Sequence, residues 1–240
     1  MKWNEVFRNT FRELNKQIEP DVRKQNDFML PSMPMVEACR ADDFDFFHPF
    51  IDAGKLTMEQ MRHATARYCL GKTRSGQPIF WMMDDMRSPL DAHIGDTWMS
   101  KFLKQREPLL KYWQVTHCLF GLHLLSEDDK SPVCIVENES SAVVLSELFP
   151  ESIWMAYATP THLVPDLFAP LEDRMVIIYP STDPTLSNYL FFQDLADLTL
   201  KTCGIALTID STLEDHATDD QKARCIDILD FLQESIQKQS

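Results

Sequence analysis

Apolar runs of strand length recur through the second half of the chain, separated by helical patterns. The runs cover residues 133–136, 153–158, 175–179 and 205–209. A short apolar run without polar interruption fits a strand that is buried on both faces of a parallel sheet. Because such strands alternate with helices here, we expect an α/β fold: a four-stranded, mainly parallel sheet flanked by helices, with the topology called Rossmann-like.

Three amphipathic helices are predicted between or after these strands. They cover residues 142–149, 186–203 and 218–237. Ser140 or Ser141 is suited to cap the first helix and Thr218 the last, because a hydroxyl can accept a hydrogen bond from a free amide of the first turn. Gly204 is expected to end the second helix, since glycine readily adopts the left-handed conformation found after helices.

The first half of the chain has the pattern of a smaller α+β region. The expected elements are helices over residues 3–18 and 57–68, paired strands over 78–84 and 92–99, and one or two helical pieces over 107–125. Thr57 and Gln60 have the spacing of a capping box, and Gly71 is expected to stop that helix. Gly95 weakens the second strand of the pair.

Changes in composition suggest three parts. Residues 1–34 combine an amphipathic helix with a polar, proline-containing linker, which would leave this helix free to dock on another domain or on a partner. Residues 35–131 form the α+β region, which includes a small β-element. Residues 132–240 form the α/β domain.

Composition fits a packed, water-soluble protein. The chain has 240 residues, of which 44% are hydrophobic, and this suffices for a sizeable core. Its six cysteines are scattered without a two-residue spacing, so we expect reduced thiols rather than a zinc or redox motif. No signal peptide and no run of about 18 apolar residues is present, and a cytoplasmic, non-membrane protein is therefore expected.

Charge differs sharply between the two halves. Residues 1–132 contain 18 Lys and Arg against 19 Asp and Glu, whereas residues 133–240 contain 5 against 18. The acidic half should repel a phosphate backbone, which disfavours nucleic acid as a partner. A basic cluster lies upstream, and it is either a nucleic-acid contact or a solvated surface; it consists of Lys101, Lys104, Arg106 and Lys111.

Three acidic residues follow predicted strands. Glu137 comes after the first strand, Asp183 after the third and Asp210 after the fourth. Ligands of open α/β sheets bind at the carboxyl ends of the strands, and Mg²⁺ prefers carboxylate ligands. Structural roles are equally open. Glu137 can cap the next helix through its backbone amides and the helix dipole, Asp183 can start a turn, and Asp210 can cap a helix.

The segments 135–142 (Ile-Val-Glu-Asn-Glu-Ser-Ser-Ala) and 176–183 (Val-Ile-Ile-Tyr-Pro-Ser-Thr-Asp) resemble the Toprim domain of primases and topoisomerases. Phe80-Trp81, residues 117–125 and Trp154 extend this resemblance to the primase-like Toprim proteins of mobile genetic elements, over roughly residues 40–200. In that family a Glu acts as general acid or base, and an Asp-x-Asp pair binds Mg²⁺ for phosphoryl transfer. The resemblance therefore implies these roles for Glu137 and Asp183.

The chain departs from the family pattern at several positions. Ser181 stands where the first Asp of the pair is expected, Leu122 where relatives favour Glu, and Ser140 where they favour a basic residue. Residues 156–160 replace the expected glycine-rich turn, and no zinc-binding module precedes the domain. Because a neutral Ser removes one of the charges that attract Mg²⁺, we expect no bound cofactor, or weakly bound Mg²⁺ if the protein is active.

Two functions follow from this pattern. The first is a non-catalytic, vestigial Toprim-like protein that binds a protein partner in a DNA replication or mobile-element context. The second is a Mg²⁺-dependent enzyme acting on nucleic acid, with Glu137, Asp183 and Asp210 at its centre. His117 and His123 are expected to be packed or solvent-facing, because their spacing does not place them on one helical face. Cys118 and Cys134 are expected to be inert.

Overall fold

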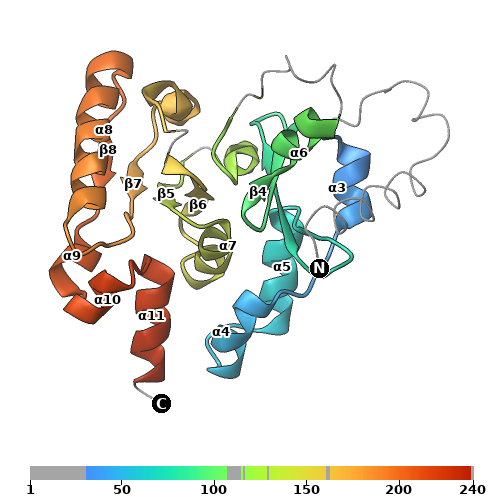
Figure 1. Cartoon of the computed structure of the whole chain (residues 1–240), viewed down its shortest axis with the longest axis horizontal. Helices are drawn as coiled ribbons and strands as arrows, with labels where there is room; N and C mark the ends of the chain where they lie inside the picture. The colour runs from blue at the N-terminus through green and yellow to red at the C-terminus, as the bar shows by residue number, and fades with distance from the viewer. Residues whose placement is uncertain (1–30, 107–114, 116, 129, 161–162, 239–240) are drawn as a thin grey trace.

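A computed structural model describes residues 31–106, 115, 117–128, 130–160 and 163–238. The helix predicted over residues 3–18, most of the linker, and Lys111 lie outside the described residues. The described chain contains two four-stranded sheets, one antiparallel and one parallel, with helices around both (Figure 1). None of the described helices is long and apolar enough to cross a membrane.

The predicted parallel sheet is confirmed. Its strands are β5 (Val133–Val136), β6 (Ile153–Ala156), β7 (Val176–Ile178) and β8 (Leu207–Ile209), and their spatial order is β6-β5-β7-β8. All three pairings are parallel. Every residue of β5 and β6 is buried, as the uninterrupted apolar runs indicate.

Helices cover both faces of the parallel sheet. The order in which strands are added to the sheet reverses at β5, since β6 lies on one side of it and β7 on the other. One face is covered by α7 (Glu139–Leu148), and the opposite face by the 3₁₀ segment η5 (Pro165–Leu171) and by α8 (Ser187–Cys203), which pack together (Figure 1). Gly204 ends α8 in the left-handed conformation, as predicted.

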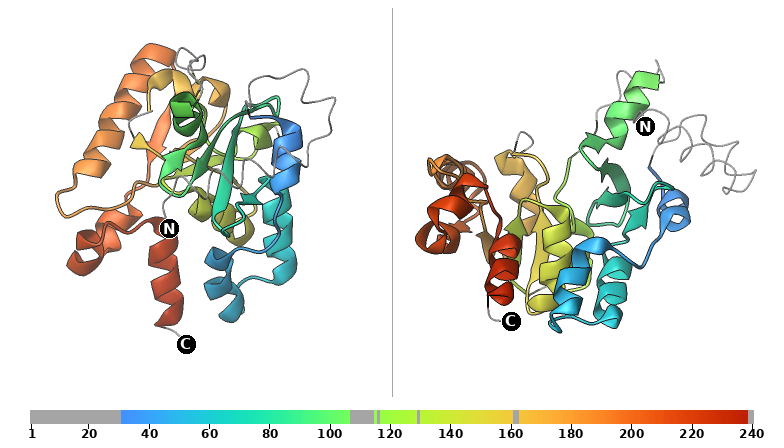
Figure 2. Two further views of the ribbon diagram at one scale, coloured as in Figure 1. Left: turned by 45° about the vertical axis from the view of Figure 1, so that its right-hand side comes forward. Right: turned by 60° about the horizontal axis from the view of Figure 1, so that its bottom comes forward.

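The prediction of a single helix over residues 218–237 is wrong, because this stretch forms two helices. After α9 (Thr212–His216), the capping box of Thr218 begins α10 (Asp219–Ala223), and α11 (Ile228–Gln237) begins at a new cap, Asp227. The Asp227 carboxylate accepts hydrogen bonds from Asn138 and Ser141, so contacts with the start of α7 fix the break. In this way α11 lies beside α7 on the sheet (Figure 2).

The antiparallel sheet contains the predicted strand pair. Its strands are β1 (Gly71–Lys72), β2 (Pro78–Met83), β3 (Pro89–Ile94) and β4 (Thr97–Trp98), in that spatial order. The strand predicted over residues 92–99 is wrong in its bounds, because β3 begins at Pro89 and ends at Ile94. A turn at Gly95 separates it from β4, so the expected weakening at Gly95 is confirmed.

Helices of the first half pack around this sheet. They are α3 (Met33–Cys39), η1 (Asp45–Phe47), α4 (His48–Asp52), α5 (Met58–Arg67) and α6 (Met99–Arg106). Thr57 and Gln60 form the predicted capping box of α5. The prediction that Gly71 ends α5 is wrong: the helix ends at Arg67, Cys69 takes a positive φ, and Gly71 belongs to β1.

Strand β2 is buried on both faces and joins two apolar cores. Phe80 and Met82 belong to a large core that extends into the parallel sheet. Ile79, Trp81 and Met83 point the other way, into a smaller core built with α3 and α6. Its β-branched and aromatic residues suit a strand that must pack on two sides.

The helical prediction for residues 107–125 is confirmed only in part where the structure describes them, because residues 117–121 are not helical and a 3₁₀ helix begins at Leu122. Phe120 pairs with Ala156 at the edge of β6 through two backbone hydrogen bonds of 2.8 and 3.1 Å. Gly121 turns the chain at φ 86°, and the 3₁₀ segment η3 (Leu122–Ser126) follows. Tyr68 donates a hydrogen bond of 2.7 Å to the Trp154 carbonyl beside this turn. The first half of the chain is thus tied to the outer edge of the parallel sheet.

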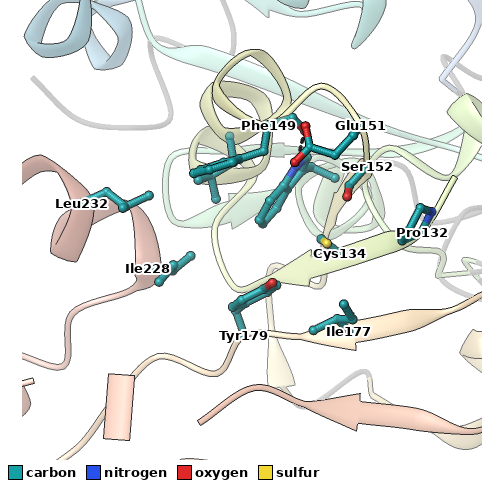
Figure 3. A pocket seen from close by; sticks show the side chains of 11 residues that line it. Pro132, Cys134, Phe149, Glu151, Ser152, Ile177, Tyr179, Ile228 and Leu232 are labelled. Carbon is teal, nitrogen blue, oxygen red and sulfur yellow. Dashed lines mark hydrogen bonds between the residues drawn. The ribbon is translucent and has the colours of Figure 1, made fainter. Parts of the chain in front are cut away.

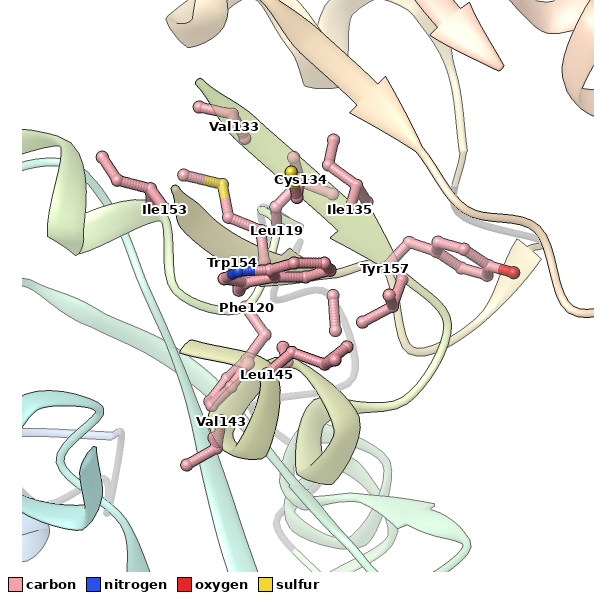
Figure 4. Close-up of a cluster of buried hydrophobic side chains, with 14 of the residues drawn as sticks. Leu119, Phe120, Val133, Cys134, Ile135, Val143, Leu145, Ile153, Trp154 and Tyr157 are labelled. Atoms are coloured by element: carbon pink, nitrogen blue, oxygen red, sulfur yellow. The ribbon is translucent and has the colours of Figure 1, made fainter. Parts of the chain in front are cut away.

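The large core is continuous across residues 131 and 132, where a domain boundary was predicted. It includes Phe44 and Phe120 from the first half as well as Ile135 and Trp154 from the second. Figure 4 shows Leu119 and Phe120 beside the side chains of β5, β6 and α7. Residues 35–131 and residues 132–240 thus share one core. The division of the chain into three parts stays a prediction.

Gly121→Ala should destabilise the protein by about 1–3 kcal/mol more than Gly76→Ala. Both glycines have a positive φ, 86° and 84°, so the backbone strain is matched. A Cβ at Gly121 would lie 3.0 Å from the Trp154 carbonyl oxygen and 3.2 Å from the Tyr68 ring, whereas at Gly76 it meets nothing within 4 Å. Urea unfolding of the two variants measures the difference, and equal losses would contradict the proposed close contact.

Candidate functional site

Glu137 and Ser181 meet at the carboxyl ends of β5 and β7. The Ser181 hydroxyl donates a hydrogen bond of 2.5 Å to Glu137 Oε2. These strands are neighbours, and the chain leaves β5 toward one side of the sheet and enters β7 from the other. In open α/β sheets a ligand crevice forms at such a switch point, outside the strand ends. The structure therefore brings Glu137 to the place where the sequence located the centre of a site.

Two further polar side chains lie beside this pair. Tyr157, directly after β6, is buried, and its hydroxyl has no hydrogen-bond partner among the described residues. Burial raises the pKa of this phenol, and the Glu137 charge raises it further. Asn188 of α8 donates a hydrogen bond of 2.6 Å to the Ser181 carbonyl. A carboxylate with two adjacent hydroxyls can exchange hydrogen bonds with a small polar ligand.

Asp183 has a structural role in the turn before α8. Its Oδ1 accepts hydrogen bonds from the Thr185 amide (2.8 Å) and hydroxyl (2.5 Å), and its Oδ2 accepts one from the Asn188 amide (2.7 Å). Burial alone would raise the pKa of this carboxyl, but these donors outweigh it and lower the pKa to about 2. The turn interpretation of Asp183 is thus confirmed, and its oxygens are already engaged by the protein.

Asp210 also stabilises a turn. Its Oδ1 accepts a hydrogen bond of 2.9 Å from the Thr212 amide at the start of α9, while the N-cap position itself belongs to Ser211. Thr182, next to Ser181, donates to Glu214 at 2.9 Å and so faces away from Glu137. Within the described residues, no group of three or more His, Cys, Asp or Glu side chains is arranged to hold a metal ion. The three predicted acids therefore do not converge.

A contact that the sequence did not indicate lies at the start of α7. Glu139 is buried, and its carboxylate lies 2.6 Å from Nδ1 of His93 on β3. The His93 ring stacks on Trp98 with centroids 4.9 Å apart. Burial lowers the pKa of His93, but Glu139, Asp96 and Asp91 outweigh burial and raise it. The pair links strand β3 of the antiparallel sheet to helix α7, and only the spacing Glu137-Asn-Glu139 could have drawn attention to it.

The predicted caps of α7 are wrong. Its N-cap is Asn138, while Ser141 donates a hydrogen bond of 2.5 Å to Asp227. The Asn138 amide donates to the same Asp227 oxygen at 3.0 Å. Both polar side chains of this turn therefore connect α7 to α11 instead of satisfying the first-turn amides.

The basic cluster is described only in part. Lys101 is exposed and Lys104 is partly buried on α6, which also contains Arg106 and whose Met99 and Leu103 enter the smaller core. This spacing is that of a solvated face of an amphipathic helix. A role in nucleic-acid binding stays a prediction.

The histidines and cysteines singled out by sequence are packed or solvent-facing. His123 is buried against the Arg67 carbonyl, and burial lowers its pKa to about 4, whereas His117 is exposed. Burial raises the pKa of the Cys118 thiol to about 12 and also raises that of Cys134. All six cysteines are free, as expected.

Part of the chain matches a known protein family. Residues 86–182 match a family described as a domain of unknown function (DUF6371), which covers less than half of the chain. No curated protein matches. The matched stretch runs from the turn before β3 to Thr182, so it includes His93, Glu137, Glu139 and Ser181 but ends before Asp183.

Asp183→Asn should flatten the acid limb of the stability curve. Because the folded-state pKa is about 2 against an ordinary value of 3.8, this carboxylate stabilises the fold above pH 4 and loses its contribution as the pH falls toward 2. Unfolding free energies measured between pH 5 and pH 2 should change less in the variant than in the wild type. Asp194→Asn, on the exposed side of α8, is the control, and an equal effect there would refute the assignment.

His93→Gln should destabilise the protein mainly at acidic pH. The raised folded-state pKa means that the charged pair contributes fully below the ordinary value of 6.5 and less as the pH rises through the folded value. We expect a loss of about 1.5–3 kcal/mol near pH 5.5, the range for hydrogen bonds to charged groups, and a smaller loss near pH 8.5. Replacing exposed His216 by Gln should show no such trend, and a pH-independent loss in His93→Gln would argue against a charged pair.

Proposed function

We propose that this protein is a Toprim-like scaffold without catalytic metal chemistry, acting through a protein partner in a DNA replication or mobile-element context. The observation that carries the proposal is the hydrogen bond from Ser181 to Glu137. Where the resemblance expects a metal-binding Asp, this chain has Ser181, and the carboxylate of Glu137 is paired with the neutral hydroxyl of that residue.

The state of Asp183 supports the same proposal. Its carboxylate receives three hydrogen bonds from the loop that starts α8. Binding a metal through these oxygens would require the loop to give up donors that already stabilise the charge. The residue that matches the second Asp of the family pattern therefore serves the turn.

An interaction role is supported by the outward face of α8. Five large apolar side chains, from the residue before the helix to its last turn, are exposed: Leu186 (39%), Leu190 (48%), Phe191 (40%), Leu198 (48%) and Leu200 (53%). A group of apolar residues on one exposed element is a typical feature of interaction sites. Asp194 and Asp197 lie among them, which favours a partner with basic groups at the rim of its interface.

The alternative function is a Mg²⁺-dependent enzyme of the phosphoryl-transfer type acting on nucleic acid. It is favoured by the position of Glu137 at the switch point of the parallel sheet, together with the unpaired hydroxyl of Tyr157. Glu137 would then be the acid or base, and Asp183 and Asp210 would have to rearrange before they could reach a metal.

Thermal unfolding with and without millimolar Mg²⁺ or Mn²⁺ separates the two functions. We expect no metal-dependent rise in Tm for the wild type. Ser181→Asp should gain one, because it places a second carboxylate beside Glu137; each kcal/mol of metal binding raises Tm by about 2–4 °C in a protein of this size.

Ser75→Asp, in the turn before β2, adds the same charge away from the parallel sheet and is the control. If the wild type shows a metal-dependent rise that Glu137→Gln abolishes, the enzyme alternative replaces the scaffold.

A further inference from the structure

A cavity of about 250 Å³ opens between the parallel sheet, α7 and α11. Figure 3 shows Phe149 at the end of α7, Tyr179 at the end of β7, and Ile228 and Leu232 of α11 around the same space. A cavity of about 150 Å³ is enough for benzene, so this one can hold a ring with a short substituent.

The cavity lies on the other face of the sheet from Glu137. Cys134, Trp154 and Ile177 occupy matching register positions on the three neighbouring strands, and all three line it. Side chains alternate between faces along a strand, so Ile135 and Tyr157 point to the side covered by α8. The cavity is therefore separate from the site described above.

One wall is aromatic. The rings of Trp154 and Tyr179 stack with centroids 5.5 Å apart, and Phe149 lies 6.1 Å from Trp154. The Trp154 indole N–H is directed away into a hydrogen bond of 3.1 Å with the Phe149 carbonyl, and this fixes the indole ring. Aromatic faces attract cations through their quadrupole, and most strongly in the case of tryptophan.

The charge of the lining also favours a cation. The residues around the cavity include one carboxylate, Glu151, and no Lys, Arg or His within the described part of the chain. The thiol of Cys134 is kept neutral, because burial raises its pKa. The surrounding half of the chain carries 18 acidic against 5 basic residues, which further opposes an anionic ligand.

We propose that this cavity binds a small organic amine, with the apolar body between Ile228, Leu232 and the aromatic wall, and the ammonium group over the rings within reach of Glu151. The aliphatic residues of α11 supply the apolar end. Glu151 and Ser152, in the turn between α7 and β6, supply the polar end. Such a site combines an apolar pocket with a few polar groups that fix orientation, as small-molecule sites usually do.

The test uses three probes that share a benzene ring and a short arm: 2-phenylethylamine, 2-phenylethanol and phenylacetate. Calorimetric titration of the full chain at low salt should give the lowest Kd for the amine, by about three- to tenfold over the alcohol, and no measurable binding of the acid. Glu151→Gln should remove most of the preference for the amine, whereas Glu172→Gln, an exposed residue after η5, should leave it unchanged.

Phe149→Leu provides a second variant, because this ring is 37% exposed and can be replaced without emptying the core. This substitution should weaken the binding of the amine more than the binding of the alcohol. Saturable amine binding with both variant effects supports the proposal. The proposal is overturned if no probe binds at millimolar concentration, if alcohol and amine bind equally, or if neither variant changes the preference.

Discussion

The fold depends on the burial of strand β5. Its four residues are buried, and they pair with β6 on one side and β7 on the other. A strand of this kind is stable only when both faces are covered, so α7 and α11 must lie on one face and η5 and α8 on the other. The same arrangement makes the end of β5 a switch point, and it sets Glu137 there. The position of the candidate site thus follows from the packing of the apolar strand β5.

Polar groups at this edge are satisfied mainly by the protein itself. Ser181 donates to Glu137, the turn before α8 donates to Asp183, and Asn138 and Ser141 donate to Asp227. Each carboxylate therefore stabilises a local junction, between β5 and β7, at the start of α8, or between α7 and α11. The buried Tyr157 hydroxyl is the exception within the described residues of this edge. The polar groups at this edge therefore serve mainly to hold the neighbouring elements together.

Much of the local structure could be predicted from sequence, and the failures share a cause. The four parallel strands, the Thr57 and Thr218 caps and the Gly204 stop depend on periodicity and on neighbouring residues, which a sequence displays directly. The break before α11 and the extended path of Phe120 depend on partners far along the chain, Asn138 and Ser141 in one case and Ala156 in the other. The pattern of residues 218–237 is compatible with one long helix as well as with two shorter ones. Tertiary hydrogen bonds decided between these two alternatives.

Sequence alone determined the class of fold and the position of Glu137 at a strand end, because burial on two faces requires uninterrupted apolar runs and because strand ends are marked by the first polar residue. Only the tertiary structure decided what these residues contact. It placed Ser181 against Glu137, separated Asp183 and Asp210 into their own turns, and joined Glu139 of α7 to His93 of β3. The same packing set Phe149, Trp154 and Tyr179 around one cavity. Contacts between residues tens of positions apart depend on how the elements pack. The spacing of residues within the sequence does not reveal which distant residues meet.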